Sequence, residues 1–217
     1  MPSLVKNKKD ILLLFILIFS SISFAQHSRA WYRVDSLTSF IANNSFKEEN
    51  DLVKMDILWQ KSLELNDHDN SEALFDLIFA CIPYKNIHLR VPVTGGILTY
   101  NILSSNDSIF NLKNKNLPKY LFFDSERTDY GDKDKPAHFF GTAFLAYNEN
   151  FFDLSNTFGY FVEAFEERFE LQNKIDARDL RANFYGSLFG KALRKNKNAK
   201  PSTFFLLHTL SYIRITI

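Results

Sequence analysis

Residues 132–190 read DKDKPAHFFGTAFLAYNENFFDLSNTFGYFVEAFEERFELQNKIDARDLRANFYGSLFG, and this stretch decides the fold. Apolar residues recur in it at intervals of three and four, which predicts three helices. Each predicted helix also carries polar residues spaced so that they project from one side. These residues are Asp134 and His138, then Glu163, Glu166 and Glu167, then Asp179 and Asn183. The pattern predicts a polar site inside a helical core.

The third predicted helix carries a stripe of four residues at spacings of four, three and four: Asp179, Asn183, Gly186 and Gly190. A glycine inside a helix costs about 1 kcal/mol relative to alanine. Two glycines on one face therefore predict that another helix packs closely there, and Asp179 and Asn183 would then need hydrogen-bonding partners. We expect His138 and Glu163 to supply them.

The first predicted helix has Pro136 in its first turn and Asp134 as its N-cap. His138 lies among phenylalanines and is expected to be partly buried, and Gly141 is expected to let a second backbone approach. On the second predicted helix, Glu163 is the best candidate for an inward carboxylate, because it is flanked by Val162 and by an aromatic run.

Length and composition predict one globular domain. The chain has 217 residues, of which 46% are hydrophobic, and its 23 phenylalanines predict an aromatic core. A formal net charge of +1 without a polybasic segment argues against nucleic acid and anionic lipid as partners. Cys81, the single cysteine, excludes an internal disulfide and a zinc–thiolate site, and we expect a buried core thiol.

Residues 1–25 have the pattern of a signal peptide. Three lysines precede the apolar run ILLLFILIFSSISF, and Ser23 and Ala25 are small residues at the expected cleavage site before Gln26. The alternative is a retained membrane anchor, although the run is shorter than the roughly 20 apolar residues that span a bilayer. We therefore expect an exported protein that is periplasmic or associated with the outer membrane.

The remaining chain, 26–217, is predicted to be a single domain, a compact and mainly α-helical bundle with a small β-hairpin insertion. Residues 26–86 are expected to form helices, the first capped by Asp35 or Ser36 and the others over 46–65 and 71–82. Residues 87–131 are expected to hold the hairpin, with a turn at Gly95-Gly96, and a long connection that is either a lid or a surface loop. Residues 132–217 form the helical core.

The order of motifs resembles two related families, the VanZ-like proteins and the YfiM-like periplasmic lipoproteins. The matching residues are Asp134, Lys135, His138 and Phe139, then Glu163, then Asp179, Asn183, Gly186 and Gly190. The resemblance covers less than a third of the chain and implies a role in the cell envelope without a defined catalytic chemistry. Two departures are plain: the helices are too short and charged to span a bilayer, and no lipobox cysteine is present.

Three interpretations of the polar residues follow. They form a structural network that fixes the helices in register, with Asp134, Gly186 and Gly190 in structural roles. Alternatively, His138, Glu163, Asp179 and Asn183 are catalytic in an envelope hydrolase, or His138, Glu163 and Asp179 hold a divalent metal. In the third interpretation, an aromatic surface makes the chain a peripheral module that binds lipid or a membrane protein. No motif names a cofactor or an oligomeric state.

Overall fold

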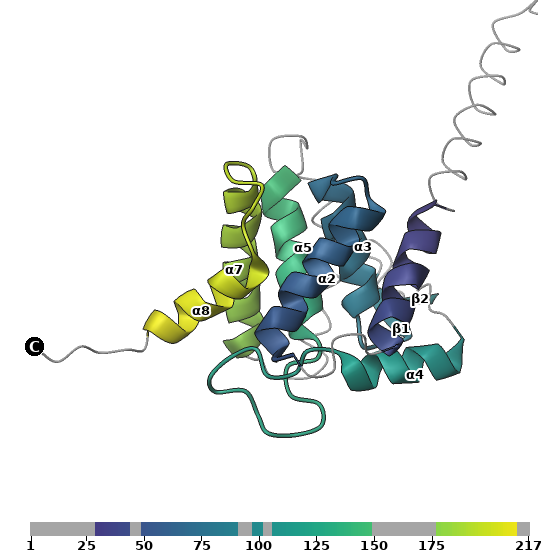
Figure 1. Ribbon diagram of the computed structural model, residues 1–217. Coiled ribbons are helices and arrows are strands. Elements are labelled where there is room, and N and C mark those ends of the chain that lie inside the picture. Colours follow the sequence, from purple (N-terminus) through teal and green to yellow (C-terminus); the bar gives the residue numbers. More distant parts are fainter. Residues whose placement is uncertain (1–28, 44–48, 91–96, 102–105, 149–176, 212–217) are drawn as a thin grey trace, which may run out of the picture.

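The computed structural model describes residues 29–43, 49–90, 97–101, 106–148 and 177–211, and these residues are mainly helical (Figure 1). A first helix covers residues 29–42 of the described chain. It is followed by α2 (Asp51–Leu65), α3 (Asn70–Cys81), α4 (Asp107–Asn116), α5 (Lys135–Asn148), α7 (Ala177–Leu193) and α8 (Pro201–Ser211). The prediction of a mainly α-helical bundle is confirmed.

Two five-residue strands, β1 (Asn86–Arg90) and β2 (Ile97–Asn101), pair in antiparallel fashion, with Asn86 opposite Asn101. Residues 91–96, which would form the predicted Gly-Gly turn, lie outside the described residues. The same is true of the predicted signal peptide. The long connection predicted after the second strand contains the helix α4, which sequence analysis missed.

Helix starts follow capping side chains. Asn50 caps α2 by accepting a hydrogen bond from the Val53 amide at 2.9 Å, and Asp69 caps α3 through the Glu72 amide at 3.0 Å. The prediction that the first helix starts at Asp35 or Ser36 is wrong, because residues 29–34 are already helical. The first helix still packs on the core, with Leu37 and Ile41 fully buried and Phe40 partly buried; on α3, Leu74, Leu77 and Cys81 are fully buried.

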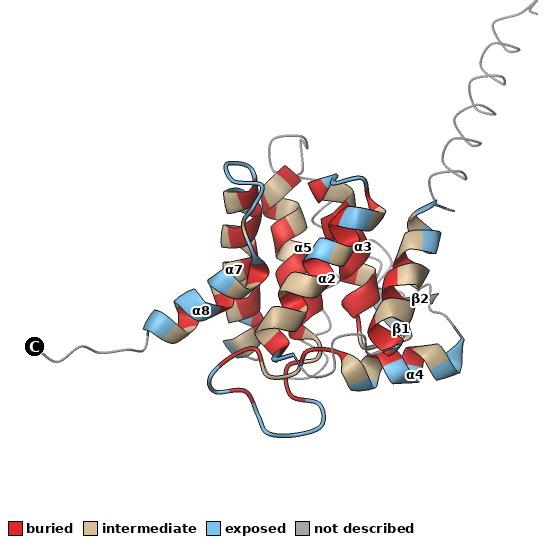
Figure 2. Ribbon diagram, viewed as in Figure 1, coloured by how far each residue is buried: buried red, intermediate tan, exposed pale blue. Residues whose placement is uncertain are grey.

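Helix α5 lies at the centre of the bundle, between α3 and α7, and α2 and α8 pack around this group (Figures 1 and 2). Its Phe139 ring stacks on Phe189 of α7 at a centroid distance of 5.3 Å and on Phe205 of α8 at 4.7 Å. Trp59 of α2 meets the edge of Phe189 at 5.4 Å. The phenylalanine content is therefore used in the core, as expected.

Helices α5 and α7 run in the same direction, because Phe139 faces Gly186 and Ala143, one turn further on, faces Gly190. The chain between them, 149–176, lies outside the described residues. This range includes the predicted second core helix with Glu163, Glu166 and Glu167.

The connection between α4 and α5 is held in place by two buried carboxylates. Asp51 of α2 accepts hydrogen bonds from the amides of Lys119 (2.9 Å) and Tyr120 (2.8 Å). Asp132 accepts from the Leu121 amide at 3.1 Å and from the Ser125 hydroxyl. Asp51 therefore ties the start of this connection to α2, and Asp132 joins its end to residues within the connection. The lid and the surface loop both stay predictions. No helix among the described residues is long and apolar enough to cross a membrane.

Candidate functional site

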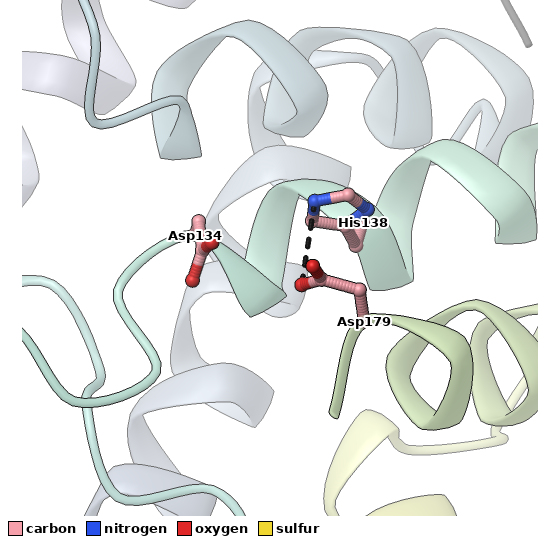
Figure 3. Close-up of side chains that lie close together, drawn as sticks. All are labelled: Asp134, His138 and Asp179. Carbon is pink, nitrogen blue, oxygen red and sulfur yellow. Dashed lines mark ion pairs between the residues drawn. The ribbon is translucent and has the colours of Figure 1, made fainter. Parts of the chain in front are cut away.

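Three of the predicted polar residues converge at the first turns of α5 and α7 (Figure 3). Asp134 directly precedes α5, His138 lies one turn into α5, and Asp179 lies in the first turn of α7. One ligand atom from each lies within 4.8 Å of the other two, and His138 Nε2 is 3.6 Å from Asp179 Oδ1. Helical periodicity predicted each face, and the parallel packing of α5 on α7 brings the two faces together.

A cation from the chain itself already lies between the carboxylates. The ammonium nitrogen of Lys135 is 2.6 Å from Asp179 Oδ1 and 3.1 Å from both oxygens of Asp134. Lys135 is only 2% exposed, which is rare for lysine and requires paired charges. The sequence names Lys135 only as a matching residue of the VanZ-like pattern, without a role in the site.

Burial sets the protonation of the histidine. Burial lowers the pKa of His138 below its ordinary value, and this effect exceeds the opposing influence of Asp179 and Asp134 and of a side-chain hydrogen bond with Asn183. Burial also raises the pKa of Asp179, against the effect of His138 and Lys135. At neutral pH the imidazole is therefore neutral, and Lys135 is the cation that compensates the carboxylates.

The glycine stripe of α7 makes the close approach possible, as the sequence predicts. A Cβ atom on Gly186 would overlap the carbonyl oxygen of Phe139, and one on Gly190 would overlap that of Ala143. The close neighbour predicted for Gly141 is not among the described residues, since no described atom lies within 4 Å of the position its Cβ would take. The contact thus uses backbone of α5 and glycines of α7, which places Asp179 and Asn183 against His138.

A second layer of charges connects this cluster to the preceding loop. The carboxylate of Asp132 is fully buried and accepts a hydrogen bond from Arg178 of α7 at 3.2 Å. Arg178 also pairs with Glu126 at 2.9 Å. Burial raises the pKa of Asp132, while Ser125, the Leu121 amide and Arg178 act in the opposite direction. The start of α7 is therefore fixed to both α5 and the loop.

One imidazole and two carboxylates are suitable ligands for a divalent cation. The ammonium of Lys135, however, lies where such an ion would be bound. Glu163, which the sequence places in both the catalytic and the metal set, lies outside the described residues. The structure therefore brings together Asp134, His138, Asp179 and Asn183, and it adds Lys135 to them.

The free cysteine is the buried core thiol that the sequence predicts. Cys81 is fully buried, and burial raises its pKa to about 12, so the reactive thiolate is not populated at neutral pH.

A second buried histidine forms a separate cluster between α7 and α8. His208 is 2% exposed, and its Nε2 atom is 3.2 Å from Nη1 of Arg181, which itself pairs with Asp124 at 2.8 Å. The rings of Phe122, Phe123 and Tyr185 surround the imidazole. Because arginine only donates, Nε2 must accept, and His208 must be neutral in this arrangement.

We expect this cluster to weaken in acid. Burial, with a smaller contribution from Arg181, lowers the pKa of His208 below 6.5, while Asp124 acts in the opposite direction. The imidazole of the unfolded chain therefore takes up a proton at a higher pH than that of the folded chain. The contribution of this cluster to the free energy of unfolding is fully present above about pH 6.5 and falls as the pH drops below that value.

Thermal unfolding of the wild type and of His208→Gln between about pH 8 and about pH 5 measures this effect. On acidification, the unfolding temperature of the wild type should fall further than that of His208→Gln. The amide oxygen of the introduced glutamine can still accept a hydrogen bond from Arg181. His68→Gln, at an exposed loop histidine, is the matched control and should behave as the wild type. Identical pH profiles for the wild type and His208→Gln would show that His208 does not titrate in this way.

No family model, no curated protein and no solved structure matches the chain.

Proposed function

We propose that this chain is an exported cell-envelope protein in which the buried cluster of Asp134, Lys135, His138 and Asp179 holds two parallel helices in register. One observation carries the proposal: the Lys135 ammonium contacts carboxylates from both sides of the α5–α7 contact, at 2.6 and 3.1 Å. One ammonium thus bridges two carboxylates within the protein, as a structural network requires.

Burial of the same groups disfavours the catalytic interpretation. A general base must reach a substrate proton, whereas His138 is 9% exposed and its Nε2 faces Asp179. The Asp179 carboxylate, a second catalytic candidate among the described residues, is occupied by Lys135. A network that is shielded on this scale is better suited to specifying a helix register than to acid–base chemistry.

The kinship with VanZ-like and YfiM-like envelope proteins is part of the proposal. The resemblance rests on two motifs that are far apart in the sequence, one with Asp134 and His138 and the other with Asp179 and Asn183. The proposal is supported because these four residues lie close together in the fold. Export is supported by the sequence of residues 1–25. Mass spectrometry of the protein from its native host should find a chain that begins at Gln26, and an intact N-terminus would contradict cleavage.

Substitution of Asp179 by Asn tests the structural role. The change removes a buried negative charge next to Lys135 and is expected to lower the free energy of unfolding by about 2 kcal/mol, measured by urea denaturation. Asp129→Asn, at an exposed carboxylate 3.8 Å from Lys119, is the matched control and should leave the midpoint unchanged. An Asp179→Asn protein as stable as the control would remove the basis of the proposal.

A second candidate function is binding of a divalent cation. The proximity of Asp134, His138 and Asp179 favours it, since one atom of each lies within 4.8 Å of the others. Isothermal titration with Zn²⁺ tests this function. A cation site predicts one equivalent of bound zinc that is lost in His138→Ala and kept in the matched control His68→Ala. Absence of binding in the wild type near neutral pH would exclude it.

A further inference from the structure

The solvent-facing side of α8 is apolar. Its exposed positions follow the helical spacing of three and four: Thr203, Leu206, Leu207, Leu210 and Ser211. The three leucines are 48%, 43% and 58% exposed, respectively. A helix at a protein surface normally places charged or polar residues on this side, and α8 contains no acidic residue, lysine or arginine. Its opposite side is anchored in the core by Phe205, so the leucine face is held outward.

The neighbouring helix α7 also exposes apolar residues. Leu180 and Phe184, one turn apart on α7, are 58% and 59% exposed. The two helices pack together through their buried sides, where Tyr185 of α7 contacts the ring of His208 of α8. Exposed apolar residues on two packed helices indicate a contact surface for another molecule.

The segment immediately before α8 carries only positive charge. Residues 191–200 contain five exposed basic side chains and no acidic residue: Lys191, Arg194, Lys195, Lys197 and Lys200. None of the four lysines forms an ion pair with a residue in the described part of the chain. The nearest leucine, Leu206, follows Lys200 by six residues, or about 9 Å along a helix. Positive charge and an apolar helix face thus lie next to each other.

We propose that α8 and the basic segment 191–200 bind the surface of an anionic lipid bilayer, with the leucines of α8 inserted at the headgroup level. Apolar burial and attraction of lysines to anionic headgroups are the two contributions that hold an interfacial helix. No polybasic segment for anionic lipid was predicted from the sequence, and the five exposed basic residues of 191–200 correct that prediction. An acidic protein partner would also satisfy the charge, but three exposed leucines on a helix without acidic residues, lysine or arginine favour lipid.

Sedimentation with vesicles tests the proposal. The protein is the chain from Gln26 onward, which keeps every described element and lacks the apolar run 11–24. Vesicles of phosphatidylcholine with phosphatidylglycerol are expected to bind it more tightly than phosphatidylcholine alone, and added salt should reduce the difference. A protein that stays in the supernatant with both vesicles overturns the proposal and leaves an acidic protein as the class of partner.

Two sets of variants separate the contributions. Leu206→Gln with Leu210→Gln should reduce binding to both kinds of vesicle at least tenfold. Each of Lys195→Gln and Lys197→Gln should reduce only the binding to anionic vesicles, about fivefold. Leu112→Gln and Lys115→Gln, at exposed positions on α4, are the matched controls. Equal losses in the controls would show that the binding is not located on α8, and circular dichroism checks that each variant is folded.

Discussion

Replacing Lys135 by methionine is expected to destabilise the protein by about 3–5 kcal/mol. Methionine keeps much of the side-chain volume but removes the charge that lies 2.6 Å from Asp179 and 3.1 Å from Asp134. The buried Asp179 and the partly buried Asp134 are then left without their cation, and an uncompensated buried charge is among the largest single-residue costs known. Urea denaturation measures the loss directly.

Two further variants make the Lys135 experiment specific. Lys61→Met, at an exposed lysine paired with Glu64, is expected to change the stability by less than about 0.5 kcal/mol. Lys135→Met combined with Asp179→Leu removes both members of the pair and should recover a large part of the loss, because an apolar pair can replace a buried ion pair. If Lys135→Met is as stable as the wild type, the ammonium does not hold the cluster together.

The same variant separates the two candidate functions. In a structural network, Lys135→Met remains destabilised when Zn²⁺ is added. In a cation site, removal of the competing ammonium would let Zn²⁺ bind to Asp134, His138 and Asp179 and restore the stability. The zinc dependence of the unfolding midpoint therefore decides between them.

Gly186→Ala is expected to cost about 3 kcal/mol or more, although the same change in an exposed helix stabilises by about 1 kcal/mol. The added methyl group would overlap the carbonyl oxygen of Phe139 and the hydroxyl of Thr142. Because a backbone carbonyl cannot move aside, α5 and α7 would have to separate, and this would also stretch the contact between Lys135 and Asp179. The thermal unfolding midpoint reports the effect.

Gly141→Ala provides the matched comparison within the same helix pair. Since no described atom lies within 4 Å of its Cβ position, this variant should be stabilised by up to about 1 kcal/mol. The test is whether the two alanine substitutions change the unfolding midpoint in opposite directions. A Gly186→Ala protein that is as stable as the wild type or more stable would contradict the close contact between α5 and α7.

The helical core and most of the cluster could be predicted because their signals are local. Asp179, Asn183, Gly186 and Gly190 recur with the period of a helix, so the sequence places them on one face before any neighbour is known. Glycine on such a face has one common cause, a close neighbour, and α5 is that neighbour. The start of the first helix was predicted wrongly from a local signal. Asp35 and Ser36 are residue types that often cap helices, but here both lie inside the helix 29–42.

Helix α4 could not be predicted from its composition. Its sequence DSIFNLKNKN is rich in asparagine and lysine, which is typical of a loop. Tertiary contacts decide its structure: Lys113 is buried, donates to the carbonyl oxygen of Ile82 and lies over the Phe110 ring at 4.4 Å. Burial lowers the pKa of Lys113 to about 8, which shows how strongly packing overrides the preference of lysine for water.

The sequence by itself determined the helical periods, the glycine stripe and the polar residues that face the core, because these depend only on the geometry of one helix. Only the tertiary structure decided the role of Lys135, since of its two carboxylates Asp134 directly precedes α5 and Asp179 lies on α7, beyond the segment 149–176. A lysine in a turn is normally solvated, and only the packing of α5 against α7 shows that Lys135 is buried. The cluster at the start of α5 and α7 is thus a contact in which the Lys135 ammonium bridges carboxylates from both sides.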